Sequence, residues 1–244
     1  MCIIAVKFKG SDFPPLDAIR NCAENNPDGF SMAWNEDGAL KTYRTMDKAE
    51  AIARYYTLST TLDPAKTALV FHARIATHGS KKLENCHCWT YGDRIAFAHN
   101  GILRNVPNRD DMTDSETFFR DIFIPALEGV GAAYALNLAE IISKDSSSRM
   151  AFIGVTGEVA LAGDWVKEQF KDLKGKIYFS NGTYRPRYHY PFGAGMSVAS
   201  LSSGRSRPAA KAPVRSTRPA VREQVGKYPE YYADIFRQTP EELP

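Results

Sequence analysis

The sequence predicts an α+β fold, in which strands and helices form separate layers. Within residues 1–195, apolar runs typical of strands cluster towards both ends, and patterns typical of helices lie between them. A parallel βαβ fold would instead alternate strands and helices. The chain has 244 residues, of which 43% are hydrophobic, so it can bury a sizeable core.

The first half of the chain combines apolar strand runs with two amphipathic segments. A strand is expected at the N-terminus, where Ile3 to Val6 form an unbroken apolar run. A helix is expected from Pro15, because Leu16, Ile19 and Ala23 repeat at helical spacing. A second helix is expected after Asp47, which suits an N-cap position. Further strands are expected at 30–34, 38–46, 67–76 and 93–103.

The second half supplies more helices and the last strands. Residues 113–130 begin with Thr113 and Glu116 at the spacing of a capping box and continue as an amphipathic helix. Residues 132–143 predict another helix. Two strand-like runs surround Thr156 and Gly157, which indicates a hairpin. A final strand is expected at 176–181.

The composition changes near residue 196, and this divides the chain. Residues 1–195 form the expected domain, with equal numbers of acidic and basic side chains. Residues 196–226 are rich in Ser, Pro and Arg, and we expect a disordered basic linker. Residues 227–244 could form a short docking helix. The basic charge is spread along the linker, so nucleic-acid binding is expected only weakly, through this tail.

Several bulk features bound the setting of the protein. No stretch approaches the roughly 20 apolar residues that a membrane span needs. The short apolar run at the N-terminus is followed by Lys7 and does not resemble a signal peptide. Four cysteines without such a signal favour a reducing compartment. We therefore expect a soluble cytoplasmic protein that has no membrane partner.

Cys2 is the first candidate for chemistry, and two interpretations compete for it. As a small apolar residue, Cys2 could simply begin a buried strand. If Met1 is removed, however, Cys2 carries both a thiol and a free α-amine. That combination suits a nucleophile with its own base.

Three further motifs each have a structural and a chemical interpretation. Arg74 interrupts a core-like run, and a guanidinium in such a place needs a partner such as a carboxylate. Asn100 and Gly101 could form a hairpin turn, or their amide groups could converge as an oxyanion hole. Asp114 could serve only the helix dipole, or it could bind an ammonium group.

The "NCHCW" motif over 85–89 raises the question of a metal. Cys86, His87 and Cys88 are consecutive, whereas zinc sites usually separate paired cysteines by two to four residues. No second cysteine pair is available to complete a site. We therefore expect neither a metal nor another cofactor.

Taken in order, these motifs resemble the class II glutamine amidotransferases, a branch of the N-terminal-nucleophile (Ntn) hydrolases. The resemblance rests on "MCIIAV", "NPDGFSMAW", "FHARIATHG", "ENCHCW", "AHNGIL" and "TDSE". It covers roughly residues 2–120, and the "NPDGF" motif is most similar to small stand-alone members. The resemblance implies a four-layer αββα sandwich of two stacked, mainly antiparallel sheets.

The resemblance also implies roles at matching positions. Cys2 matches the nucleophile, and Asn100 with Gly101 matches the oxyanion hole. Arg74 matches the residue that binds the α-carboxylate of glutamine, and Asp114 the residue that binds its α-ammonium. The remaining residues in substrate-binding motifs are Thr77, His78 and His87. Many relatives have His-Pro where this chain has His87-Cys88.

The sequence therefore predicts a glutaminase subunit that releases ammonia for a separate synthase, because no synthase domain follows residue 195. One alternative is a stand-alone hydrolase that acts on a larger γ-glutamyl amide. Another is a catalytically silent scaffold on the same fold, which retention of Met1 would favour.

Overall fold

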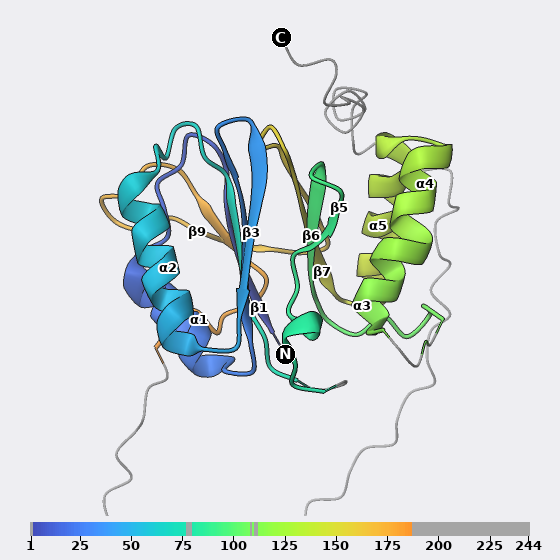
Figure 1. Cartoon of the computed structure of the whole chain (residues 1–244), viewed down its shortest axis with the longest axis horizontal. Coiled ribbons are helices and arrows are strands. Elements are labelled where there is room, and N and C mark those ends of the chain that lie inside the picture. Colours follow the sequence, from blue (N-terminus) through green and yellow to red (C-terminus); the bar gives the residue numbers. More distant parts are fainter. Residues whose placement is uncertain (1, 77–79, 108, 110–111, 187–244) are drawn as a thin grey trace, which may run out of the picture.

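The structure is a computed structural model that describes residues 2–76, 80–107, 109 and 112–186. Two antiparallel sheets stack face to face, and helices cover the outer face of each (Figure 1). The predicted α+β class and its four-layer αββα arrangement are therefore confirmed. The expected linker at 196–226 and docking helix at 227–244 lie outside the described residues, as does the end of the expected domain.

The first sheet has six strands in the order β3-β2-β4-β1-β10-β9. Helices α1 (Leu16–Asn25) and α2 (Lys48–Thr61) cover its outer face (Figure 1). Asp47 caps α2 as expected, since its side chain accepts a hydrogen bond from the Glu50 N–H. The strands are β1 (Ile3–Lys7), β2 (Phe30–Glu36), β3 (Ala39–Thr45), β4 (Leu69–Ala73), β9 (Val166–Glu168) and β10 (Ile177–Phe179).

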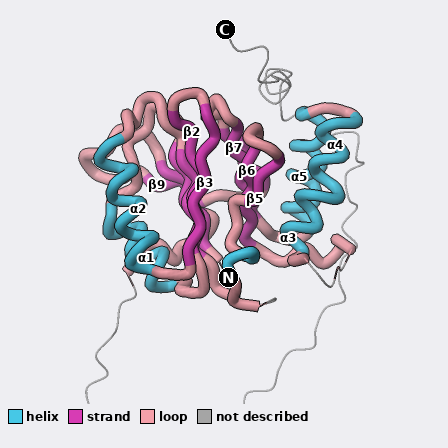
Figure 2. The backbone as a smooth tube through the Cα atoms, in the orientation of Figure 1, coloured by secondary structure: helices cyan, strands magenta, loops and turns pink. Residues whose placement is uncertain are grey.

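The second sheet has four strands in the order β5-β6-β7-β8. They are β5 (Trp89–Tyr91), β6 (Ile95–Asn100), β7 (Arg149–Gly154) and β8 (Val159–Ala162). The segments that cover the outer face are α3 (Asp114–Thr117), a π-helical turn η2 (Phe118–Phe123), α4 (Ile124–Gly129) and α5 (Ala132–Asp145). Figure 2 shows these helices on the side of the sheet that faces away from the first sheet.

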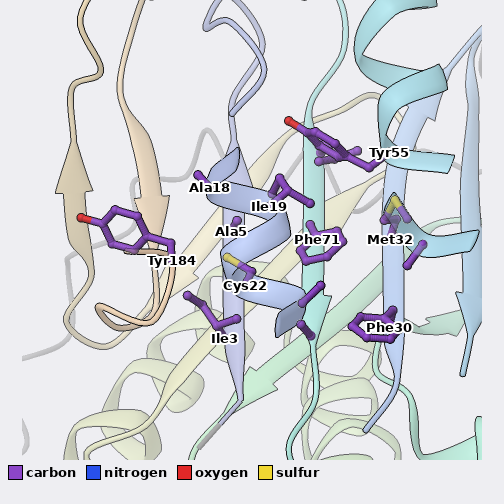
Figure 3. Packing of buried hydrophobic residues seen from close by; sticks show 14 of the residues in the cluster. Ile3, Ala5, Ala18, Ile19, Cys22, Phe30, Met32, Tyr55, Phe71 and Tyr184 are labelled. Atoms are coloured by element: carbon purple, nitrogen blue, oxygen red, sulfur yellow. The ribbon is translucent and has the colours of Figure 1, made fainter. Parts of the chain in front are cut away.

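Each layer boundary has its own apolar core. Figure 3 shows Ile19 and Cys22 of α1 beside Ile3 and Phe71 of the first sheet. The boundary between the two sheets is lined instead by smaller residues, including Ala33, Ala96, Ala98 and Ala151. Small side chains allow two sheets to approach closely, so the strand ends of both sheets can contribute to one site.

The structure also sharpens several strand boundaries. The strand expected at 67–76 ends at Ala73, which places Arg74 directly after it. The strand expected at 93–103 ends at Asn100. β6 pairs with β5 and β7, and the next helix is α3, so Asn100 and Gly101 do not form a two-residue hairpin turn. A short 3₁₀ helix, η1 (Leu83–Asn85), follows the segment at 77–79 that the structure does not describe.

Candidate active site

The candidate site lies at one end of the strands of the two stacked sheets. β1 begins and β4 ends there, because Ile3 pairs with Ala73 in an antiparallel register. β10 ends there too, since Ala5 pairs with Phe179. Figure 1 shows the start of α3 and the helix η1 near the same ends of the strands. Cys2 and Arg74, which are distant in sequence, are therefore neighbours across two paired strands.

Cys2 precedes β1 and is only partly exposed. Its Sγ donates a hydrogen bond of 3.6 Å to the Ile75 carbonyl, and its own carbonyl accepts one of 2.7 Å from Asn181 Nδ2. Burial raises the pKa of the Cys2 thiol above its usual value, although the positive charge of Arg74 opposes this change. A thiol in this environment needs a base before it can act as a nucleophile.

Arg74 is 3% exposed and lies in a loop that is held at several points. Its backbone exchanges hydrogen bonds with Asp28 and Gly29, and its Nη1 donates to the Ser80 carbonyl at 3.0 Å. The Asp28 carboxylate also accepts from the Ala76 N–H at 2.9 Å and forms an ion pair with Lys81. Asp28 therefore fixes the backbone on both sides of Ile75.

Asn100 is the last residue of β6, and Gly101 follows it. Asn100 is 2% exposed, and its Nδ2 lies 2.8 Å from the Oγ of Ser180, which follows β10 of the other sheet. Gly101 has a φ of 152°, and a Cβ on it would lie 2.3 Å from Ser148 Cβ. The backbone of Gly101 is therefore packed too closely against Ser148 to carry a side chain.

Asp114 is the first residue of α3, and Thr113 is the N-cap that was expected at this position. One carboxylate oxygen accepts from the Leu103 N–H at 2.7 Å, so Asp114 is tied to the loop that follows Gly101. The other oxygen accepts from the Ser115 N–H and hydroxyl. A carboxylate has about four acceptor positions, so these three donors leave room for a further donor.

His87 lies in a stack of imidazole rings between the sheets. Its ring is 3.9 Å from that of His72 and nearly parallel to it. Its Nδ1 accepts a hydrogen bond from the His99 N–H, and His99 Nδ1 is 2.7 Å from Ser115 Oγ. Burial holds the pKa of His87 well below 6.5, so the ring is neutral. Among the described residues, no hydrogen bond joins His87 to Cys2.

The family of this chain follows from its sequence. The family model described as glutamine amidotransferases class-II matches residues 5–155, which is more than half of the chain. The chain belongs to the class II glutamine amidotransferases. The matched segment contains Arg74, Asn100, Gly101 and Asp114 of the candidate site, while Cys2 lies three residues before its start.

The similarity of the chain to one curated protein extends over about half of the chain. A curated protein of Haemophilus influenzae, named a candidate glutamine amidotransferase, is 29% identical over 126 residues. That match covers 48% of this chain and 41% of the relative, so the chain matches less than half of the relative's length.

Two solved structures match most of the chain at low identity. A glutamine aminotransferase class-II domain protein from Silicibacter pomeroyi is 17% identical with a TM-score of 0.43, and the match covers 73% of this chain and 88% of that one. The glutamine phosphoribosylpyrophosphate amidotransferase of B. subtilis, complexed with ADP and GMP, is 15% identical with a TM-score of 0.43. That match covers 74% of this chain and 42% of the other. The assignment of the chain to its family rests on the family model.

Two residues of the site were missed at the level of sequence. Ser180 and Asn181 directly follow β10 and contact Asn100 and Cys2. The only available signal was a polar pair at the end of a short apolar strand, which is also typical of a turn. Thr77 and His78 lie outside the described residues, so their expected roles remain predictions.

Among the residues that the structure describes, no group of three or more His, Cys, Asp or Glu side chains could hold a metal ion. None of the helices in the same part of the chain has both the length and the apolar character that a membrane span requires.

Proposed function

We propose that this chain is a glutamine amidotransferase subunit that releases ammonia from the side chain of glutamine for use by a separate synthase. The nucleophile is the thiol of Cys2, which becomes the N-terminal residue when Met1 is removed. The main support is that the start of β1, the end of β4 and the end of β6 lie close together. Cys2 lies beside Arg74 there, and Asn100 is joined to the same place through its hydrogen bond with Ser180.

The reaction begins with the transfer of a proton from the Cys2 thiol. The α-amine of Cys2 has an ordinary pKa of about 7.7–8.0, so it is partly neutral at physiological pH and can accept that proton. The thiolate then attacks the side-chain amide carbon of glutamine. The carbonyl oxygen becomes an oxyanion, which the Asn100 side-chain amide and the Gly101 N–H stabilise.

The intermediate then collapses to products. The C–N bond breaks, the leaving nitrogen takes the proton held by the α-amine, and ammonia departs. A γ-glutamyl thioester remains on Cys2. Water attacks its carbonyl carbon, the C–S bond breaks, and glutamate leaves with the thiol restored.

The amino-acid end of the substrate carries two opposite charges. Arg74 offers a buried guanidinium for the α-carboxylate, and Asp114 has one acceptor position left for the α-ammonium. A ligand that lacks either charge would lose one of these two charge-assisted contacts, which disfavours its binding.

The first test is a glutaminase assay on the purified full chain, after intact-mass measurement has confirmed the loss of Met1. We expect equal amounts of glutamate and ammonia from glutamine. Cys2→Ala should lower turnover by at least about 10³-fold, because it removes the nucleophile. Cys22→Ala is the matched control, since Cys22 is a buried thiol of α1 that contacts the core.

The outcomes separate the three candidate functions. Cleavage of a γ-glutamyl dipeptide with glutamine left intact would favour a stand-alone γ-glutamyl-amide hydrolase. Turnover of either substrate that survives Cys2→Ala would contradict the proposed nucleophile. No turnover of either substrate by the mature chain would favour a catalytically silent scaffold.

A further inference from the structure

The side chains of Ser180 and Asn100 can be joined by a hydrogen bond in either of two directions, and the second direction satisfies more of their polar atoms. Ser180 Oγ accepts from the Ile4 N–H at 2.8 Å and from Asn100 Nδ2 at 2.8 Å. Within the described part of the chain, Asn100 Oδ1 is buried and has no hydrogen-bond partner. Over the same residues, no acceptor faces the Ser180 hydroxyl proton. One acceptor and one donor are thus left unused within the same contact.

Turning the Asn100 amide by half a turn resolves both mismatches. The Ser180 hydroxyl still accepts from Ile4 and now donates to Asn100 Oδ1, at a distance typical of an O–H···O hydrogen bond. Asn100 Nδ2 moves to the place that the unpartnered oxygen held. The oxygen and nitrogen of an asparagine amide are assigned from such networks.

We infer that Ser180 is a positioning residue whose hydroxyl donates to Asn100 Oδ1 and thereby directs Asn100 Nδ2 towards the substrate oxyanion. This inference rests on the proposed function. It gives the reaction a residue from directly after β10 that touches no reacting atom. It also gives a physical reason for a hydroxyl here, because an alanine would let the amide take the unproductive orientation.

The location of Ser180 suits this role. Ser180 is 1% exposed, and its backbone N–H donates to the Ile4 carbonyl, which extends the pairing of β10 with β1. Ser180 is therefore held to β1 by its backbone, directly after β10 ends. A donor whose backbone is fixed in this way can hold a neighbouring amide in one orientation throughout the reaction.

The test is a pair of double-mutant cycles in the full chain. We expect Ser180→Ala to lower kcat about 10- to 100-fold and to leave KM for glutamine within about two-fold, because an oxyanion donor acts mainly in the transition state. In an Asn100→Ala background, Ser180→Ala should have less than about a three-fold further effect, since both act through one group. Ser180→Thr keeps a hydroxyl and should restore most of the activity.

Asn181→Ala is the neighbouring control. Asn181 bonds the Cys2 carbonyl rather than Asn100, so its effect should multiply with that of Asn100→Ala. The rate at which iodoacetamide alkylates Cys2 should be the same in Ser180→Ala and in the parent. An equal loss of kcat from Ser180→Ala in both backgrounds would overturn the inference and indicate a structural role through Ile4.

A neutron crystal structure of the full chain gives an answer that does not depend on activity. A deuterium on Ser180 Oγ that points to Asn100 Oδ1 supports the inference. Asn100 Nδ2 donating to Ser180 Oγ overturns it, even in an active protein. If the parent has no Cys2-dependent turnover, the proposed function fails, and the neutron structure still decides the orientation of the amide.

Discussion

Gly101 has a backbone that almost any side chain would disturb. Its φ of 152° is rarely adopted by other residues, and a Cβ would meet Ser148 at 2.3 Å and His99 Nε2 at 3.1 Å. We expect Gly101→Ala to lower kcat by about 10²- to 10³-fold, because the N–H that faces the oxyanion would move. The free energy of unfolding should fall by about 1–3 kcal/mol from overpacking.

Gly38→Ala is the control for this prediction. Gly38 also has a positive φ, of 73°, but a Cβ on it would have no neighbour within 4 Å. It lies in the turn between β2 and β3. Its replacement should cost stability without a loss of kcat. Equal kinetic effects of the two variants, in steady-state glutaminase assays, would contradict a specific role for Gly101.

At the scale of residues, the sequence predicted the site residues whose side chains are costly to bury. It did not predict those whose side chains fit many environments. Arg74 could be nominated because a guanidinium within an apolar run demands a partner. Asn100 could be nominated because it interrupts a strand pattern. Ser180 could not, since a small hydroxyl at a strand end is satisfied in many environments. Only the hydrogen bond between Asn100, at the end of β6, and Ser180, just after β10, reveals its contact.

At the scale of elements, the start of α3 connects stability with the site. Thr113 caps this helix through a hydrogen bond from the Glu116 N–H to its side chain, and Asp114 follows directly. Thr113→Ala should cost about 1 kcal/mol of stability, as for other N-caps. It should also raise KM for glutamine several-fold, because the first turn holds the carboxylate proposed to bind the α-ammonium.

Asp47→Ala provides the matched comparison for the cap. Asp47 caps α2 in the same manner, but α2 covers the first sheet and holds no residue of the candidate site. Urea unfolding should give similar losses of stability for both variants. Steady-state kinetics should separate them, and the same KM in both would argue against a role of α3 in binding.

The helical pattern at 113–130 was predicted, but its internal geometry was not. The structure divides it into α3, the π-helical turn η2 and α4. The wider turn accompanies the burial of Phe118, Phe119 and Phe123, which contact Phe97 and Phe152 of the second sheet. That geometry depends on the tertiary contacts of the rings, which hydrophobic periodicity does not encode. Likewise, β5 (Trp-Thr-Tyr) and β9 (Val-Lys-Glu) are short and contain polar residues, whereas β10, which is equally short, is an apolar run and was predicted.

At the scale of the whole molecule, local patterns predicted the classes of element but not the pairing of strands. The strand order β3-β2-β4-β1-β10-β9 joins the two ends of the described chain. Such pairings are set by long-range contacts, so they could be expected only through the family resemblance. The same contacts bring together His72 of β4 with His87 and with His99 of β6.

This histidine stack makes the stability of the molecule depend on pH. Burial lowers the pKa of His72 from 6.5 to about 3 and that of His99 to about 4. The unfolded chain therefore binds protons near pH 6.5, while the folded chain does not. The stability that these neutral rings contribute is present above pH 6.5 and is lost as the pH falls from 6.5 towards 4.

His72→Phe tests this directly, because it keeps a flat ring against His87 but cannot take up a proton. The free energy of unfolding of the parent should fall more steeply than that of the variant between pH 6 and 4.5, by about 1.4 kcal/mol per pH unit for the one proton removed. Urea unfolding at a series of pH values measures the difference between the two curves. Above pH 7.5 that difference should be constant, because His72 is then neutral in both the folded and the unfolded chain, and phenylalanine carries no charge at any pH. Parallel curves across the whole range would mean that His72 takes up its proton as readily in the folded chain as in the unfolded one.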